Sequence, residues 1–297
     1  MQKFLAATFV VVSLLVAGAQ TNSNSTRAED VIYGRKFGTA LTLDVFTPLQ
    51  QNGAGILWLV SAGYGSSHEA INPKYFHALL ARGYTVFAVV HGSVPKFGVE
   101  EIEPDILRAV RFVRHHSADY GVNPQRLGSI GASAGGHLSL TLATRGGPGD
   151  ASATDPITRE TSVVQCSVAF FPPTDYLNYG KPGREAEWIK PLLGVNPTND
   201  APTRAAETTR LLREISVIYR VHSNQPPVLI FHGDKDYLVP VEQAQTFVVA
   251  SEKLGNETKL IIKPGAGHGW PDMAADMETA ADWFDKHLSN STPADSK

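Results

Sequence analysis

The sequence predicts an α/β protein with a doubly wound, mainly parallel sheet and a helical cap insertion. Short apolar runs alternate with helix-like segments along most of the chain, which favours a parallel sheet covered by helices on both faces. Several runs are continuous, such as ILWLV at 56–60, and this is typical of strands buried on both faces. One stretch of more than fifty residues, 171–227, interrupts the alternation and is expected to hold the cap.

The composition is that of an ordinary globular protein. The 297 residues are 42% hydrophobic and 19% charged, which provides enough chain for one large core. The formal net charge of −3 offers no basic field for nucleic acid or an anionic membrane, so neither partner is expected. The single cysteine, Cys166, lies in an apolar run and is expected to be buried; one cysteine allows no internal disulfide.

The first nineteen residues have the pattern of a secretory signal peptide. Lys3 precedes an apolar run over 4–17, and Ala17-Gly18-Ala19 fits a small-x-small cleavage site. We therefore expect cleavage near Ala19 and export to the periplasm or the medium. The alternative is an uncleaved N-terminal anchor, but the run is short for a membrane span, so stable membrane insertion is not expected.

One folded domain is expected over 31–289, between two polar ends. Residues 20–30 are rich in Ser, Asn and Thr and predict a disordered linker, and residues 290–297 predict a disordered tail.

The expected strands begin with an antiparallel pair. Apolar and polar residues alternate over 31–37 and 41–46 around Gly38, as in two strands joined by a turn. The later strands are mostly continuous apolar runs, as in a buried parallel sheet. They are expected at 56–60, 84–90, 127–130, 163–170, 228–232 and 258–262.

The expected helices follow the strands in turn. The segment 104–116 is amphipathic, because apolar residues at 106, 109, 110 and 113 share one helical face. Helices are expected at 73–81, 104–116, 137–144, 204–219, 241–254 and 273–288.

The cap is expected at about 176–225. An insertion at the carboxyl end of a parallel strand lies over the sheet edge where α/β proteins bind their ligands. A shorter polar insertion at 146–161 is expected to border the same opening.

The stretch Gly131-Ala132-Ser133-Ala134-Gly135 fits the pattern G-x-S-x-G between an expected strand and an expected helix. Strand, sharp turn and helix form the setting of a nucleophilic serine, here Ser133. The glycines let the strand and helix backbones approach closely, and the helix N-terminus favours negative charge. The pentapeptide alone also arises by chance in Gly- and Ser-rich loops, so the surrounding strand and helix carry the prediction.

A nucleophilic serine needs a base, and the base needs an orienting acid. The run PPVLIFH leads into Gly233-Asp234-Lys235-Asp236, and TKLIIK leads into a loop that contains His268. Parallel strands would bring Ser133, Asp236 and His268 to one sheet edge. Their order along the chain is that of α/β-hydrolases, unlike that of chymotrypsin or subtilisin.

The motifs GASAGGH, HGDKDYLVP and GAGHGW resemble those of α/β-hydrolases of the esterase/lipase group. The likeness is greatest to the carboxylesterase and feruloyl-esterase-like (BD-FAE-like) branch, and it covers about 31–288. It implies an α/β-hydrolase fold and a catalytic triad of Ser133, Asp236 and His268, because the acid of the family is the second Asp of Gly-Asp-x-Asp. Asp234 is then expected to cap the turn. No cofactor is implied, and the histidines show no metal-ligand spacing, so no metal site is predicted.

The oxyanion loop departs from the family pattern. Where the family has His-Gly-Gly after the third strand, this chain reads Ser61-Ala62-Gly63-Tyr64-Gly65. Since the donors are backbone N–H groups, alanine can still serve. We expect the N–H of Ala134 and one or two from Ala62, Gly63 and Tyr64 to form the oxyanion hole.

These features together predict an exported serine hydrolase that cleaves small-molecule or polymer-linked carboxylic esters through an acyl-enzyme. Candidates to line its substrate pocket are Tyr64, Tyr176, Trp188 and Trp270, although each could equally pack the cap on the body. One alternative is a serine peptidase of the prolyl-oligopeptidase type, which shares the triad order but has a propeller domain that is absent here. Another is a non-catalytic relative that binds a ligand through its cap, for which the altered oxyanion loop leaves room.

Overall fold

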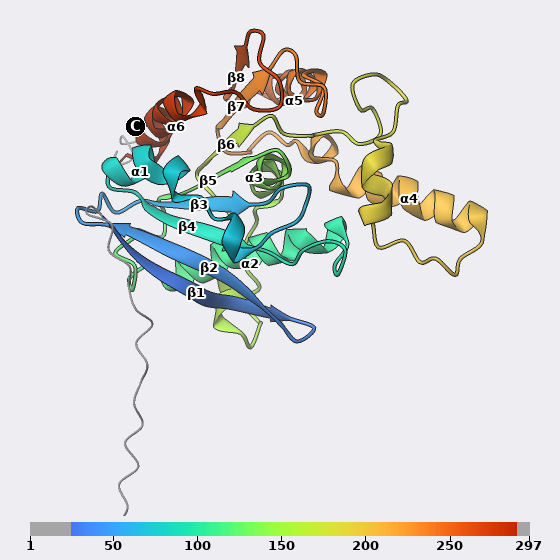
Figure 1. Cartoon of the computed structure of the whole chain (residues 1–297). Coiled ribbons are helices and arrows are strands. Elements are labelled where there is room, and N and C mark those ends of the chain that lie inside the picture. Colours follow the sequence, from blue (N-terminus) through green and yellow to red (C-terminus); the bar gives the residue numbers. More distant parts are fainter. Residues whose placement is uncertain (1–24, 290–297) are drawn as a thin grey trace, which may run out of the picture.

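The protein is described by a computed structural model over residues 25–289 (Figure 1). The expected signal peptide, residues 20–24 of the expected linker and the expected tail at 290–297 lie outside these residues. The described chain forms an eight-stranded sheet in the order β1-β2-β4-β3-β5-β6-β7-β8. Helices cover both faces of this sheet, so the prediction of an α/β, doubly wound architecture is confirmed.

The sheet is antiparallel at one edge and parallel elsewhere. β2 pairs antiparallel with β1 and with β4, and all further neighbours from β4 to β8 run parallel. The carboxyl ends of the six parallel strands therefore meet at one edge. The strands are β1 Ser25–Lys36, β2 Thr39–Pro48, β3 Gly55–Val60, β4 Thr85–Val90, β5 Leu127–Ala132, β6 Cys166–Phe170, β7 Val228–Gly233 and β8 Thr258–Lys263.

The helices divide between the two faces because each presents one apolar stripe to the sheet. α2, α3 and α5 pack on one face, and α1 and α6 pack on the other. The expected helix at 73–81 begins as a 3₁₀ turn over Pro73–Phe76. The helices are α1 His77–Ala81, α2 Ile102–His115, α3 Ala134–Arg145, α4 Ala201–Ile215, α5 Glu242–Glu252 and α6 Met273–Leu288.

The predicted linker is wrong for residues 25–30, because Ser25 to Asp30 form the first half of β1. Their partners lie in β2, where Ser25 is opposite Pro48 and Ala28 is opposite Val45. The polar composition that suggested disorder is that of an edge strand whose alternate side chains face solvent. Strand pairing supplies the backbone hydrogen bonds that a local reading of the sequence could not reveal.

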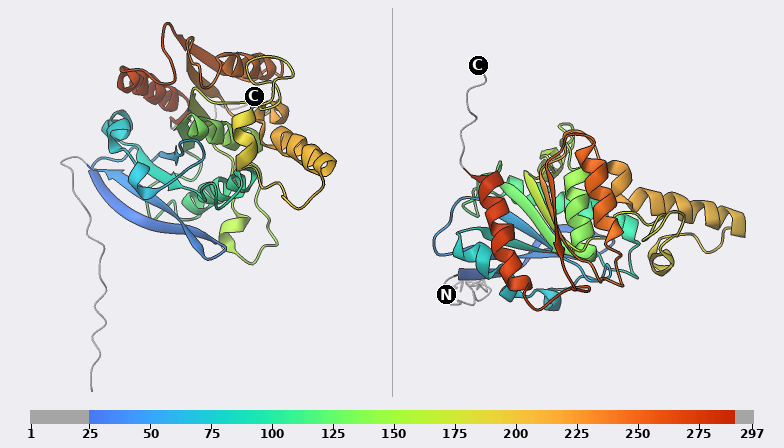
Figure 2. Two further views of the ribbon diagram at one scale, coloured as in Figure 1. Left: turned by 45° about the vertical axis from the view of Figure 1, so that its right-hand side comes forward. Right: turned by 90° about the horizontal axis from the view of Figure 1, so that it is seen from above.

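The cap insertion leaves the end of β6 and returns at the start of β7. It contains a 3₁₀ helix, Glu187–Leu192, and the long helix α4, which projects away from the layered body (Figure 2). Tyr176, Ile189 and Leu212 bury its inner side in the same core cluster as α2 and α3. The cap is therefore anchored near the carboxyl edge of the sheet.

Cys166 is fully buried in β6, as predicted. None of the helices between residues 25 and 289 is long and apolar enough to cross a membrane.

Candidate active site

Ser133 lies at the tip of a sharp turn between β5 and α3. Its φ of 55° and ψ of −120° are sparsely populated for a residue with a side chain, and such a conformation costs about 1–3 kcal/mol. The glycines of the motif make the turn feasible. A Cβ on Gly131 would lie 2.3 Å from the carbonyl oxygen of Gly135, and one on Gly135 would lie 2.5 Å from that of Leu59. The predicted close approach of strand and helix is confirmed.

The structure brings Ser133, His268 and Asp236 into one hydrogen-bonded row. His268 Nε2 lies 2.9 Å from Ser133 Oγ, and His268 Nδ1 lies 2.7 Å from Asp236 Oδ2. A carboxylate only accepts, so Nδ1 carries the proton of the neutral ring and Nε2 is free to accept from the serine hydroxyl. Strands β5, β7 and β8 present the three residues at their carboxyl ends.

Asp236 is held as a carboxylate. Its side chain is buried, and burial alone would raise the pKa of the carboxyl. Hydrogen bonding from His232 and His268, together with the Val239 amide, outweighs burial and brings the pKa well below its usual range. Its Oδ1 also accepts the Leu238 amide at 2.9 Å. The group is therefore ionised at neutral pH and fixed toward His268.

Asp234 joins the loops that follow β7 and β8. Its Oδ1 accepts the amide of Gly265 at 2.7 Å, and the next amide, that of Lys235, donates to the carbonyl oxygen of Ala266 at 2.9 Å. Asp234 thus stabilises the loop that carries His268, which agrees with the turn-capping role expected for it.

The oxyanion loop is a tight hairpin turn. Ala62 and Gly65 exchange two backbone hydrogen bonds of 2.9 Å, and both residues between them have positive φ, 55° at Gly63 and 68° at Tyr64. Positive φ at both central positions is the pattern of a type I′ turn. The Ala62 N–H is therefore occupied, which corrects its place among the expected donors.

The three other expected donor amides have no hydrogen-bond partner among the described residues. The N–H groups of Gly63, Tyr64 and Ala134 donate to no other group between residues 25 and 289. Ala134 is the first residue of α3, where amides have no partner within the helix. Of the expected donors, Gly63, Tyr64 and Ala134 thus keep a free N–H group, whereas Ala62 does not.

Ser61 and His91 support the turn from the side of β4. His91 Nδ1 lies 2.7 Å from the carbonyl oxygen of Gly92, so Nδ1 is the donor and Nε2 accepts the Ser61 hydroxyl at 2.9 Å. Burial lowers the pKa of His91 to about 4, so the ring is neutral at pH 7. No sequence motif includes His91, because its contact with Ser61 depends on two strands that are adjacent only in the folded sheet.

A cavity of about 810 Å³ opens over Ser133. The body contributes Gly63, Phe171 and His268, and the cap contributes Trp188, with charged side chains at its border. The sequence did not identify several of the lining residues, although some directly follow Asp236. These are Arg184, Glu185, Glu187, Tyr237 and Leu238.

A second cavity of about 370 Å³ also borders His268. It is aromatic and apolar, with Trp58, Tyr75, Trp270 and Met273 in its wall. Phe171 and His268 border both cavities, so the site offers two compartments at His268.

Of the four candidate pocket residues, two line a cavity and two do not. Trp188 borders the larger cavity and Trp270 the smaller one. Tyr64 and Tyr176 are fully buried in the core cluster between cap and body, which corrects the expectation that their side chains face substrate. The positive φ of Tyr64 turns its side chain inward while its amide stays at the turn.

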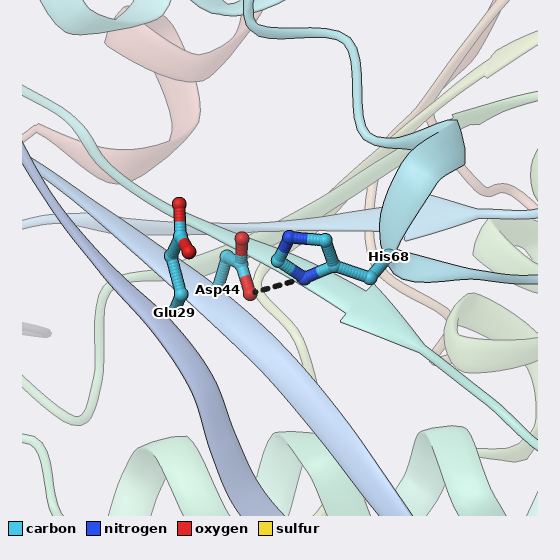
Figure 3. A group of neighbouring side chains, drawn as sticks. All are labelled: Glu29, Asp44 and His68. Atoms are coloured by element: carbon cyan, nitrogen blue, oxygen red, sulfur yellow. Dashed lines mark ion pairs between the residues drawn. The ribbon is translucent and has the colours of Figure 1, made fainter. Parts of the chain in front are cut away.

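One group of metal-ligand type occurs among residues 25–289, formed by Glu29, Asp44 and His68 (Figure 3). The Arg27 guanidinium fills the cationic position there: its Nε donates to Asp44 at 2.8 Å, and its Nη1 lies 3.2 Å from Glu29. None of the three residues lines either cavity at the triad. The group therefore carries no metal assignment.

Two curated proteins of similar sequence are a peptidase and an esterase by name. The uncharacterized peptidase YuxL of Bacillus subtilis is 25% identical over 286 residues, which cover 88% of this chain and 39% of that protein. The esterase LipQ of Mycobacterium tuberculosis is 30% identical over 181 residues, 59% of this chain and 40% of that protein. The chain thus spans about two fifths of the length of these relatives.

The fold recurs in solved structures. A truncated form of a carbohydrate esterase from gut microbiota superposes with a TM-score of 0.74 at 23% identity, over 92% of this chain and 100% of that one. The BD-FAE family model matches residues 43–250, which is well over half of the sequence and includes Ser133 and Asp236. The chain therefore belongs to the BD-FAE family and has the α/β-hydrolase fold.

Proposed function

We propose that this chain is an exported serine hydrolase that cleaves carboxylic esters through an acyl-enzyme intermediate. The observation that carries the proposal is the ordered row from Ser133 through His268 to Asp236 at the floor of a large cavity. The family membership and the esterase LipQ among the relatives support ester chemistry. The signal-peptide pattern of residues 1–19 supports export.

The proposed reaction begins when Ser133 Oγ attacks the ester carbonyl. His268 Nε2 takes the hydroxyl proton as the new C–O bond forms, and the Asp236 carboxylate stabilises the resulting imidazolium. The amides of Gly63, Tyr64 and Ala134 donate to the oxyanion of the tetrahedral intermediate. His268 then protonates the leaving alcohol. Water, deprotonated by His268, attacks the acyl-enzyme and releases the acid.

The two compartments suggest how an ester is accommodated. The smaller aromatic cavity fits a compact apolar substituent, while the larger one admits a bulkier group beside polar cap residues. Arg184, Glu185 and Glu187 provide hydrogen-bonding groups at that opening. Both small-molecule esters and esters attached to a polymer are compatible with an open cavity of this size.

The decisive experiment is covalent labelling of the folded protein with a fluorophosphonate probe. We expect labelling of Ser133 and hydrolysis of short p-nitrophenyl esters, with both lost in Ser133→Ala. The variant should lose several powers of ten in kcat/KM, because the nucleophile is removed. Folded wild-type protein that neither labels nor hydrolyses esters would instead support the non-catalytic alternative.

A peptidase is the second candidate, since YuxL is named as one. Assaying aminoacyl p-nitroanilides beside p-nitrophenyl esters with the same acyl group separates the two activities. The ester proposal predicts that the enzyme accelerates ester hydrolysis much more than amide hydrolysis, when each kcat/KM is divided by the rate constant of the non-enzymatic reaction. Preferential amide cleavage would favour the peptidase. Export is checked separately by N-terminal sequencing of the secreted protein, which should begin near Gln20.

A further inference from the structure

A buried group of three side chains lies behind the oxyanion turn. The Tyr64 hydroxyl lies 3.0 Å from His137 Nδ1 and also contacts the Tyr176 hydroxyl. Each of the three side chains is at most 3% exposed. None of them lines the large cavity over Ser133, and the proposed proton transfers do not use them.

The direction of every hydrogen bond in this group follows from the contact between His137 and the backbone of Ile215. His137 Nε2 lies 2.7 Å from the carbonyl oxygen of Ile215, which can only accept, so Nε2 carries a proton. Burial lowers the pKa of His137 to about 4, so the neutral ring leaves Nδ1 as an acceptor. Tyr64 therefore donates to His137, and Tyr176 donates to Tyr64. The row has one defined order of donors.

This row joins the turn to both neighbouring elements. Tyr64 is the second central residue of the oxyanion turn, and His137 lies in the first turn of α3, where its amide donates to the Ser133 carbonyl at 2.9 Å. Tyr176 lies near the start of the cap insertion, and Ile215 is the last residue of α4 within it. Four segments that are distant in sequence thus meet at one buried group of hydrogen bonds.

We propose that Tyr64, His137 and Tyr176 are positioning residues for the oxyanion hole, and that the cap completes the hole through them. This role rests on the proposed function, and it consists of orienting the donor amides. The Tyr64 amide and its phenol belong to one residue, so fixing the hydroxyl on α3 limits how the turn can rotate. The amides of Gly63 and Tyr64 are then held at a constant position relative to Ser133.

The test compares Tyr64→Phe with Tyr84→Phe. Tyr84 is also buried, and its hydroxyl donates to Asp285 at 2.6 Å, but it lies outside both cavities and the oxyanion turn. We expect Tyr64→Phe to lower kcat by about 10- to 100-fold, less than the loss of a whole oxyanion donor, with KM changed by less than about twofold. Tyr84→Phe should keep the wild-type kcat, although its Tm falls.

A second measurement separates positioning from general loosening. An alkyl trifluoromethyl ketone adds to Ser133 as a hemiketal whose oxyanion occupies the hole, whereas the matching methyl ketone remains a non-covalent ligand. Tyr64→Phe should weaken the fluorinated inhibitor by the same factor as kcat/KM and leave the methyl ketone affinity unchanged. In Tyr64→Phe/Tyr176→Phe the loss should not exceed that of Tyr64→Phe alone, because both hydroxyls act in one row.

The inference is overturned if Tyr64→Phe keeps kcat within about twofold of the wild type, or if both ketones weaken equally. Either result would assign the row to fold stability alone. The proposed function is judged independently, by whether the wild-type protein labels at Ser133 and hydrolyses esters. An active wild type with an active Tyr64→Phe would remove this inference and leave the esterase proposal in place.

Discussion

Acidification from pH 7 to pH 5 should destabilise this protein through two neutral histidines. His91 and His137 are each 3% exposed, and burial lowers the pKa of each to about 4. In the unfolded chain both return to about 6.5. A group with a lowered folded pKa stabilises the fold fully above about pH 6.5, and that contribution is lost as the pH falls toward 4.

The linkage relation gives the size of the effect. For one such histidine the free energy of unfolding falls by about 2 kcal/mol between pH 7 and pH 5, and two independent groups would give about 4 kcal/mol. That is a large part of the 5–15 kcal/mol, roughly, by which domains are stable. The loss is set by protonation of the unfolded chain, so it precedes the acid range in which carboxylates such as Asp236 titrate.

Urea unfolding at pH 7 and pH 5 measures the loss directly. His137→Gln is the informative variant, because an amide can still accept from Tyr64 and donate to Ile215 but does not titrate. Its loss between the two pH values should be smaller than that of the wild type by about 2 kcal/mol. His115→Gln, on the surface of α2, serves as the control for the substitution itself. Equal losses in wild type and His137→Gln would refute the assignment of a buried neutral ring.

Three further predictions concern Asp236, the sharp turn at Ser133 and Cys166. Asp236→Asn should lower kcat by about 10³- to 10⁴-fold in folded protein. Asp234→Asn should keep most of the kcat, because Asp234 does not contact His268. If ester assays show the larger loss in Asp234→Asn, the roles of the two aspartates are exchanged. Gly135→Ala places a Cβ 2.5 Å from a β3 carbonyl oxygen, so soluble expression or Tm should fall sharply, and a wild-type Tm would contradict the close packing. Cys166 should react with a thiol reagent only after unfolding, because burial removes access and raises the pKa of its thiol; rapid labelling of native protein would show otherwise.

Much of the fold, and the meeting of Ser133, His268 and Asp236, could be predicted because the relevant signals are local. Each buried strand is a short apolar run, and Ser133, Asp236 and His268 each lie in the loop or turn that follows such a run. Parallel strands then bring their carboxyl ends to one edge without further information. The close backbone approach at the glycines beside Ser133 could also be predicted, since it depends only on the turn that contains them.

The remaining features depend on contacts between distant residues. Tyr64 is paired with residues 73 and 112 positions later, and no local pattern indicates whether its side chain turns toward substrate or into the core. The Ala62 amide is occupied because of the particular turn that the loop adopts, which Gly63 alone did not specify. The start of β1 was missed because its ordering comes from the pairing with β2.

The strand from which the cap insertion leaves bears on how proteins of this fold can diversify. The insertion leaves from β6, which lies between β5, the strand of the serine, and β7, the strand of the aspartate. Its length can change without altering the spacing of those two strands, so caps should be exchangeable between relatives as units. A transplanted cap, however, would pack against the oxyanion turn, where the Tyr64 hydroxyl contacts the Tyr176 hydroxyl of the present cap. We expect chimaeras that retain this tyrosine to keep their turnover while they acquire a new substrate range.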